Sequence, residues 1–311
     1  MIYPNLVIAG APKCGTTSLH NWLSLHPSAF GAKEKELRYL MDANYPLVRD
    51  GGYNRSGLDG YARYFETSGT GKYKCIFETT PDYIYQNTAI EVLASQLPET
   101  RVAFILRRPA DRVLSMFKFT QNNISIVPAN MTFLDFIKEI QKEGPDGKPG
   151  GLFSERKIIA NSINHSRYAK FLEQWYERIS PERISIWRFE ELAADPKLFM
   201  KRFATYFGLE QNNYDDFSFT HRNESFSVKS QKINRIIRSF RPYVSSSLKS
   251  AVALQWTRTA YRAIVERPTS FESKKVDYTP ILENLDNIFE ADNRRLETLT
   301  GLDFSCWSDD R

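Results

Sequence analysis

The feature that most constrains this chain is an apolar run that leads through a short loop into an amphipathic helix, VIAGAPKCGTTSLHNWL at residues 7–23. The apolar run ends at Gly10, and the loop contains Lys13 and Gly15. Backbone N–H groups and the helix dipole meet at the start of such a helix, where they favour an anion. A plain connecting turn needs neither a lysine nor a row of hydroxyls. The sequence therefore predicts a phosphate-binding loop that consists of Lys13, Cys14, Gly15, Thr16, Thr17 and Ser18.

This loop differs from the two common nucleotide-binding motifs. The triphosphate-binding motif GxxxxGK[ST] places its lysine directly after the second glycine, whereas Lys13 precedes Gly15. The Gly-Lys pairs at residues 71–72 and 147–148 are followed by Tyr73 and Pro149, which do not fit the motif. The dinucleotide fingerprint GxGxxG does not follow the first apolar run. A kinase or a dehydrogenase is therefore disfavoured.

Apolar runs alternate with segments of helical periodicity along the first two thirds of the chain. Strands are predicted at residues 6–9, 75–78, 101–106 and 184–187. Helices are predicted at residues 17–25, 88–97, 111–119, 166–176, 190–193, 196–207 and 282–299. This alternation predicts an α/β fold, with a parallel sheet flanked by helices.

We expect one domain over residues 1–311, in which two segments are set apart. Residues 41–72 lack sustained periodicity and are predicted to form an insertion that faces a substrate. Residues 221–311 are predicted to be a mostly helical C-terminal part. No apolar run reaches the length of about eighteen residues that crosses a bilayer, so no transmembrane segment is predicted. Three scattered cysteines form no paired motif, which favours a reducing, cytoplasmic setting.

The positive charge of the chain is concentrated in residues 229–267. This segment has nine basic residues and one acidic residue, with apolar residues at helical spacing between them. The pattern predicts amphipathic helices with a cationic face. That face could contact a polyanion such as an anionic glycan, or it could simply be solvated. No nucleic-acid partner is expected.

A second motif, FILRRPADRVLSMF at residues 104–117, completes a resemblance to a known family. Together with the phosphate loop it resembles the sulfotransferases that use 3′-phosphoadenosine 5′-phosphosulfate (PAPS). The resemblance implies that Arg107 and Ser115 bind the 3′-phosphate, a task for which a bidentate arginine is well suited. Arg108 and Arg112 are expected to be surface or helix-stabilising charges.

The resemblance covers roughly residues 5–210, where residues 166–208 look like the family's helix, strand and helix that end in Phe-Gly-Leu. It is looser in the last hundred residues. A further basic donor-binding loop that the family carries there is placed between Arg222 and Lys229.

The segment GAKEKELRYL, residues 31–40, resembles the Lys-Glu-x-x-aromatic motif of heparan-type and related bacterial sulfotransferases, with Lys35, Glu36 and Tyr39 at the matching positions. The resemblance implies that Glu36 is the general base. Lys35 would keep Glu36 ionised and could contact the sulfuryl group, while Lys13 stabilises the charge that develops during transfer. Alternating Lys and Glu residues are also typical of an exposed loop.

Other candidates for the base stay open. They are Glu34, His20, His26 and above all His165, because the small-molecule branch of the family uses a histidine. No group of His, Cys or acidic residues has metal-ligand spacing, so no metal is expected.

The function that the resemblance implies is sulfuryl transfer from PAPS to a hydroxyl group, or with lower preference an amine, of a carbohydrate. The donor product is 3′-phosphoadenosine 5′-phosphate (PAP). A small hydroxylated metabolite is the alternative acceptor, and a non-catalytic nucleotide- or polyanion-binding module is the alternative class.

Two departures from the family pattern bear on the acceptor and on the location. The lysine that heparan-type enzymes commonly carry after the strand ending at Glu78 is absent, which argues against a heparan-like acceptor. Cys306 has no nearby partner for the family's late disulfide. Both departures favour a bacterial-style cytoplasmic enzyme.

Overall fold

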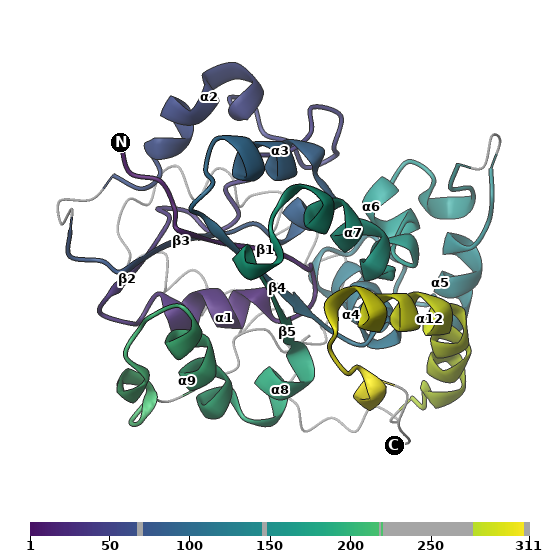
Figure 1. Cartoon of the computed structure of the whole chain (residues 1–311). Coiled ribbons are helices and arrows are strands. Elements are labelled where there is room, and N and C mark those ends of the chain that lie inside the picture. Colours follow the sequence, from purple (N-terminus) through teal and green to yellow (C-terminus); the bar gives the residue numbers. More distant parts are fainter. Residues whose placement is uncertain (67–70, 145–147, 218, 220–275, 308–311) are drawn as a thin grey trace, which may run out of the picture. The chain divides into compact units, whose positions relative to one another are not determined.

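The computed structural model of the chain describes residues 1–66, 71–144, 148–217, 219 and 276–307 (Figure 1). These residues form two compact units. The first unit comprises residues 1–66, 71–112, 165–217, 219 and 288–307, and the second comprises 113–144, 148–164 and 276–287. Arg222, Lys229 and the basic segment 229–267 lie outside the described residues, so the predictions made for them stay predictions. The single-domain assignment also stays a prediction.

The first unit is built on a five-stranded parallel sheet with the order β2-β3-β1-β4-β5. Central strands β1 (Leu6–Gly10) and β4 (Arg101–Leu106) are almost entirely buried. Their continuous apolar runs are typical of parallel strands that are covered on both faces. The other strands are β2 (Ala29–Gly31), β3 (Cys75–Thr79) and β5 (Ile184–Arg188). The predicted α/β class is confirmed.

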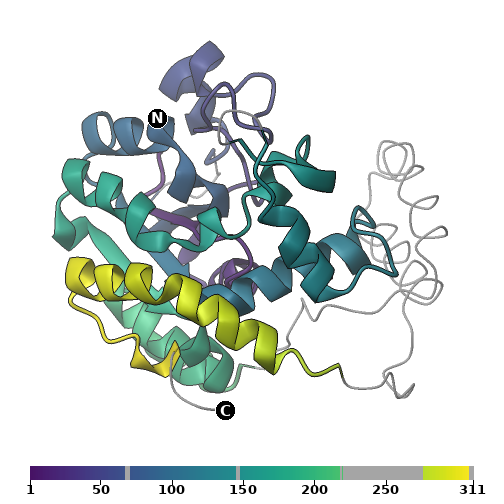
Figure 2. The ribbon, with the colours of Figure 1, turned by 90° about the vertical axis from the view of Figure 1, so that its right-hand side faces the viewer.

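Helices cover both faces of this sheet (Figures 1 and 2). Helices α1 (Thr16–Leu23) and α9 (Pro196–Tyr206) contact each other on one face, and α3 (Asn87–Ser95) and α7 (Tyr168–Arg178) contact each other on the opposite face. The Asp195 side chain accepts a 2.9 Å hydrogen bond from the Leu198 N–H and so caps α9. The unit also contains α2 (Tyr53–Ala62) and α8 (Phe189–Ala194).

The second unit is helical and has an aromatic core. It contains α5 (Phe133–Ile140) and the short α6 (Lys157–Ala160). Two longer helices, α4 (Pro109–Lys118) and α12 (Thr279–Thr300), have residues in both units. Four phenylalanines pack together in this unit: Phe117, Phe133, Phe136 and Phe153. Among the described helices, none is both long and apolar enough to cross a bilayer.

The position of β1 in the sheet determines where a ligand site can form. Strand β1 lies between β3 and β4, so the strand order reverses there. In open parallel sheets, the carboxyl ends of the strands at such a reversal are the usual site of ligand binding. The predicted phosphate loop follows β1, Arg107 follows β4, and the Glu78–Thr80 segment ends β3. The two predicted donor-binding segments and the end of β3 therefore meet at one edge of the sheet.

Candidate functional site

The phosphate loop connects β1 to α1 through two residues in the left-handed backbone region, Lys13 (φ 72°) and Gly15 (φ 85°). A Cβ atom on Gly15 would lie 2.8 Å from Cδ2 of Phe189, so both the backbone and the packing require glycine. The Ala11 N–H donates to the Ile105 carbonyl at 2.8 Å and ties the loop to β4. Because Gly15 is the N-cap of α1, no side chain caps the helix.

The residues of the loop differ in what they can present to a ligand. Thr17 is half-buried, whereas Thr16 and Ser18 are 4% and 8% exposed. The Cys14 thiol is fully buried, lies 3.5 Å from the Tyr168 hydroxyl, and has its pKa raised by burial. The Cys14 side chain therefore belongs to the core, and only its backbone is part of the loop.

Positive charge gathers around Lys13. Burial lowers the pKa of Lys13 to about 8, and the nearby guanidinium groups of Arg107 and Arg112 contribute to this shift, while Glu36 opposes it. The Arg107 guanidinium lies 4.6 Å from the centre of the Phe189 ring, and the Arg107 carbonyl accepts a 2.9 Å hydrogen bond from the Tyr168 hydroxyl. This edge of the sheet is therefore electropositive and suited to an anion.

The arginines after β4 differ from the prediction made for them. Arg108 lies within 3.8 Å of Asp111 in the first turn of α4, as expected for a helix-stabilising charge. Arg112, predicted to be a surface or helix charge, is fully buried. Its guanidinium is bonded to groups from three distant segments, which the helical pattern alone does not reveal. Ser115 lies on α4 within the second unit, and its assignment to the 3′-phosphate stays a prediction.

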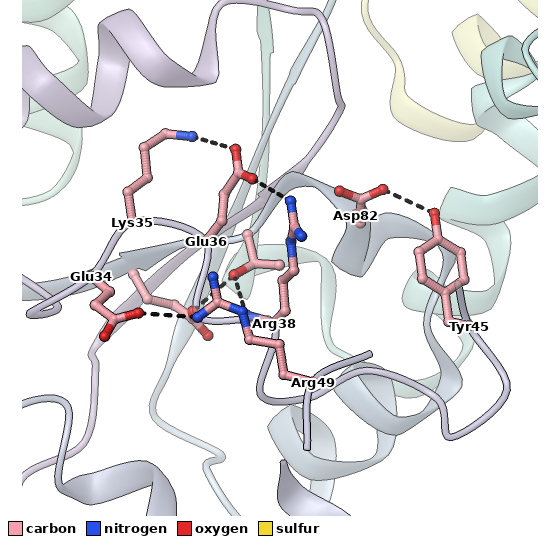
Figure 3. Close-up of polar contacts among 9 residues, drawn as sticks. Glu34, Lys35, Glu36, Arg38, Tyr45, Arg49 and Asp82 are labelled. Carbon is pink, nitrogen blue, oxygen red and sulfur yellow. Dashed lines mark hydrogen bonds and ion pairs between the residues drawn. The ribbon is translucent and has the colours of Figure 1, made fainter. Parts of the chain in front are cut away.

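The predicted base Glu36 is held by an ion pair on each carboxylate oxygen (Figure 3). Lys35 Nζ lies 2.6 Å from Oε1, and an Arg38 guanidinium nitrogen lies 2.9 Å from Oε2. Burial alone would raise the pKa of Glu36, but Lys35 and Arg38 outweigh it, so the pKa lies below its usual value. The Glu36 N–H donates to the Thr79 carbonyl at 3.0 Å, which anchors the residue at the carboxyl end of β3.

Arg38 is a residue of this site that the sequence analysis did not single out. Its guanidinium lies between Glu36 and Asp82 in Figure 3, and all three residues interact electrostatically. Asp82 is 8% exposed, accepts a 2.9 Å hydrogen bond from the Tyr45 hydroxyl, and has its pKa raised by burial. Arg38 occupies a variable position of the Lys-Glu-x-x-aromatic motif, so the motif carried no signal for it.

Three other candidates for the base have structural partners. The Glu34 carboxylate, 59% exposed, pairs with Arg49 at 3.0 Å (Figure 3). His26 uses both ring nitrogens, at 3.0 Å from the Glu210 carbonyl and 3.1 Å from the Ser28 N–H. His165 stacks on Tyr85 with ring centres 4.2 Å apart, and burial lowers its pKa to about 3. The His165 ring is therefore a weak base.

His20 lies near Glu36, because both residues contact Thr79 at the carboxyl end of β3. Its Nδ1 lies 3.0 Å from the Thr79 hydroxyl, and burial followed by the charge of Lys35 lowers its pKa to about 4. Glu78, next to Thr79, is fully buried and accepts hydrogen bonds from the Tyr61 and Thr80 hydroxyls. Burial raises the pKa of Glu78 to about 7.

Within the described ranges, no group of three His, Cys, Asp or Glu residues could hold a metal ion.

The arrangement as a whole places a cationic loop beside a carboxylate. Lys13 and Glu36 are close enough that the carboxylate raises the pKa of the lysine. An anionic donor on the loop would thus lie next to a group that can accept a proton from a nucleophile.

Comparisons with known proteins identify the type of domain. The model of the sulfotransferase domain family matches residues 3–269. Bifunctional heparan sulfate N-deacetylase/N-sulfotransferase 2 of Bos taurus is 24% identical over 211 residues, which cover 66% of this chain and 22% of that protein. The type 3 enzyme of Homo sapiens is 25% identical over 219 residues, 68% of this chain and 23% of that protein. The chain thus spans less than a quarter of the length of these relatives.

A solved structure supports the fold. The crystal structure of a sulfotransferase from Alicyclobacillus acidocaldarius covers 99% of this chain and 100% of its own, with a TM-score of 0.64 and 19% sequence identity.

Proposed function

This chain belongs to the sulfotransferase domain family, and on that premise we propose that it transfers a sulfuryl group from PAPS to a hydroxyl group of a carbohydrate acceptor. An amine is the less favoured nucleophile. The chain is a sulfotransferase, and PAPS is the donor that its family normally uses. A carbohydrate acceptor is supported by the relatives, which are named as heparan sulfate N-deacetylase/N-sulfotransferases.

The observation that carries the donor assignment is the crowding of cations at the phosphate loop. Lys13, Arg107 and Arg112 are close enough that the two guanidinium groups lower the pKa of the lysine. A bound polyanion would remove this repulsion, because opposite charge favours the protonated lysine. We assign the 5′-phosphosulfate to Lys13 and residues 14–18, and the 3′-phosphate to Arg107 and Ser115. Arg222 and Lys229 are further proposed donor contacts.

In the proposed mechanism, the acceptor oxygen attacks sulfur in line with the bridging oxygen of the phosphosulfate. The Glu36 carboxylate takes the acceptor proton while the new O–S bond forms. The S–O bond to the bridging oxygen breaks, and its electron pair stays on the phosphate of PAP. The Lys13 ammonium stabilises this developing charge, and Lys35 keeps Glu36 ionised until the acceptor binds.

Calorimetric titration with PAP tests the donor site. We expect the wild-type chain to bind PAP more tightly than ADP or AMP, because only PAP presents both phosphate groups to the two cationic positions. Arg107→Ala should weaken PAP binding by about one hundredfold, since a charge-assisted bidentate contact is lost. Equal affinity for ADP and PAP, or no binding of either, would refute the donor assignment.

Glu36→Gln tests the base, with Glu34→Gln as its matched control on the same segment. We expect Glu36→Gln to lower turnover by about 10²- to 10⁴-fold, since general base catalysis contributes that much. Its PAP affinity should stay within about twofold of wild type, because Glu36 is not assigned to the donor. Glu34→Gln should retain turnover, because its carboxylate is exposed and paired with Arg49. Retained turnover in Glu36→Gln would remove Glu36 from the mechanism.

A further inference from the structure

Arg112 is a fully buried cation whose hydrogen bonds join the phosphate loop to two other segments. Its Nε donates to the Pro12 carbonyl, and its two terminal nitrogens donate to the Ser166 hydroxyl and the Tyr85 hydroxyl, each at 2.9 Å. Burying a guanidinium group is unfavourable unless its N–H groups are satisfied in good geometry. The chain therefore keeps a buried charge where an apolar residue would be easier to accommodate.

The bond to Pro12 determines the direction of a peptide group in the phosphate loop. In a trans peptide, the carbonyl and the following N–H point in opposite directions. Because the Pro12 carbonyl faces Arg112, the Lys13 N–H faces away from Arg112. Lys13 has a φ of 72°, a conformation that a residue with a Cβ atom adopts at a cost, so contacts around the loop must hold it.

We propose that Arg112 is a positioning residue that holds the phosphate loop in its donor-binding conformation before the donor arrives. This inference rests on the proposed function, and it adds a residue that touches the loop and not the reacting atoms. The planar guanidinium of Arg112 can donate three hydrogen bonds at the same time. They go to the loop, to the turn at Ser166 and to the end of the 3-10 helix Pro81–Tyr85. A lysine would keep the charge but lacks this fork.

The test compares Arg112→Lys with Arg183→Lys. Arg183 is a matched control because it also donates several hydrogen bonds, to the carbonyls of Leu93, Leu97 and Thr100. Thr100 precedes β4, so Arg183 lies at the amino edge of the sheet and not at the loop. Tyr85→Phe and Ser166→Ala keep Arg112 but remove one of its partners each, which covers the case in which Arg112→Lys does not fold.

Amide hydrogen exchange of the ligand-free protein measures how often the backbone of the loop opens, and so tests directly whether Arg112 stabilises it. In Arg112→Lys, we expect the amides of residues 13–18 to exchange about tenfold faster, with smaller increases in Tyr85→Phe and Ser166→Ala. Arg183→Lys should leave these amides unchanged. Unchanged exchange at residues 13–18 in Arg112→Lys, Tyr85→Phe and Ser166→Ala alike would overturn the inference, whether or not the chain binds PAP.

PAP titration adds the functional readout. Arg112→Lys should weaken PAP binding by about tenfold or more, since charge-assisted hydrogen bonds are lost. Wild-type PAP binding should weaken above about pH 8 as Lys13 loses its proton. Arg112→Gln should move this loss to higher pH, because a cation that lowers the pKa of Lys13 is removed, whereas Arg112→Lys should not.

The outcomes separate the inference from the proposed function. If wild type binds PAP and Arg112→Lys binds it equally well, the inference fails and the proposed function stands. If wild type does not bind PAP, the proposed function fails and hydrogen exchange alone decides the inference. An alkaline loss of binding at the same pH in Arg112→Gln and wild type would exclude any electrostatic action of Arg112 on Lys13.

Discussion

The phosphate loop and the acid segment at residues 33–38 both lie at the carboxyl edge of the sheet, yet they are held in different ways. The loop is fixed by buried contacts to distant residues, such as Ala11 with Ile105 and Pro12 with Arg112. In the acid segment the backbone is bonded to the end of β3, but the Glu36 side chain is held by ion pairs with near neighbours. Water reaches these ion pairs, because the side chains of Lys35, Glu36 and Arg38 are 20%, 32% and 27% exposed.

This difference fits the tasks proposed for the two regions. A donor loop works best when it is already formed, because ordering it during binding would weaken affinity. Glu36, in contrast, must exchange a partner before it can accept a proton from an acceptor. Partly exposed ion pairs contribute little free energy, about 0–1 kcal/mol, so such an exchange is easy. Substitutions in the loop should therefore have larger effects than substitutions among the partners of Glu36.

Among substitutions in the loop and among the partners of Glu36, the largest effect is expected for Lys13→Met. Turnover should fall by about 10²- to 10³-fold, because the loop loses the charge that stabilises the leaving phosphate. Steady-state kinetics measure this loss, and circular dichroism checks the fold. Lys33→Met is the control, since Lys33 is exposed and donates to the Arg63 carbonyl at 2.9 Å. A loss of less than tenfold in Lys13→Met would mean that the loop lysine matters no more than the partners of Glu36.

An intermediate effect is expected for Gly15→Ala. The free energy of unfolding should fall by about 2 kcal/mol, because alanine is strained at φ 85° and its Cβ would press on Phe189. PAP affinity should fall as well, since the Phe189 ring supports Arg107. Gly208→Ala is the control: φ is 73° there but the space is open. Denaturant unfolding and calorimetry measure both quantities, and equal costs at the two glycines would contradict the role of packing at Gly15.

The smallest effect is expected for Arg38→Met. Without the Arg38 cation, the pKa of Glu36 should rise, so the acidic limb of the pH–turnover profile should move to higher pH. At pH 8 the carboxylate stays ionised, and turnover should change by less than about tenfold. Arg49→Met, which removes only the exposed partner of Glu34, should leave the profile in place. An acidic limb that does not move in Arg38→Met would show that Glu36 is not the group that titrates.

The parts of the fold that the sequence predicted are those with a strong local pattern. The apolar runs of β1 and β4 lie within one residue of their predicted bounds because both strands are buried on both faces. Strand β2 has only three residues, too few to show a pattern. Helix α2, inside the predicted insertion at 41–72, contains Gly57 at a non-helical φ of 54° and Gly60, which weaken any helical signal. Helix α5 was also not predicted.

Local sequence patterns also decide which parts of the candidate site could be predicted. The phosphate loop is contiguous in sequence, so its lysine, glycine and hydroxyls could be recognised together. Arg112 was placed wrongly because its partners Pro12, Tyr85 and Ser166 are separated from it by 100, 27 and 54 residues. A charged residue in a helix is expected to be exposed to solvent unless such partners are known. The conformation that pairs Arg38 with Glu36 also depends on β3, through the bond from the Arg38 N–H to the Thr80 hydroxyl.

The buried carboxyl group of Glu78 takes up a proton when the chain folds at mildly acidic pH. Its pKa rises on folding from 4.5 to about 7, because burial disfavours the charged form. Between these values the folded chain keeps a proton that the unfolded chain releases, so the contribution of Glu78 to stability decreases as the pH rises through this window. The number of protons exchanged on unfolding near pH 6, measured from how the heat of unfolding varies with the ionisation enthalpy of the buffer, should therefore differ by about one between wild type and Glu78→Gln. For this group, mild acid and not mild alkali is the condition that favours the folded chain.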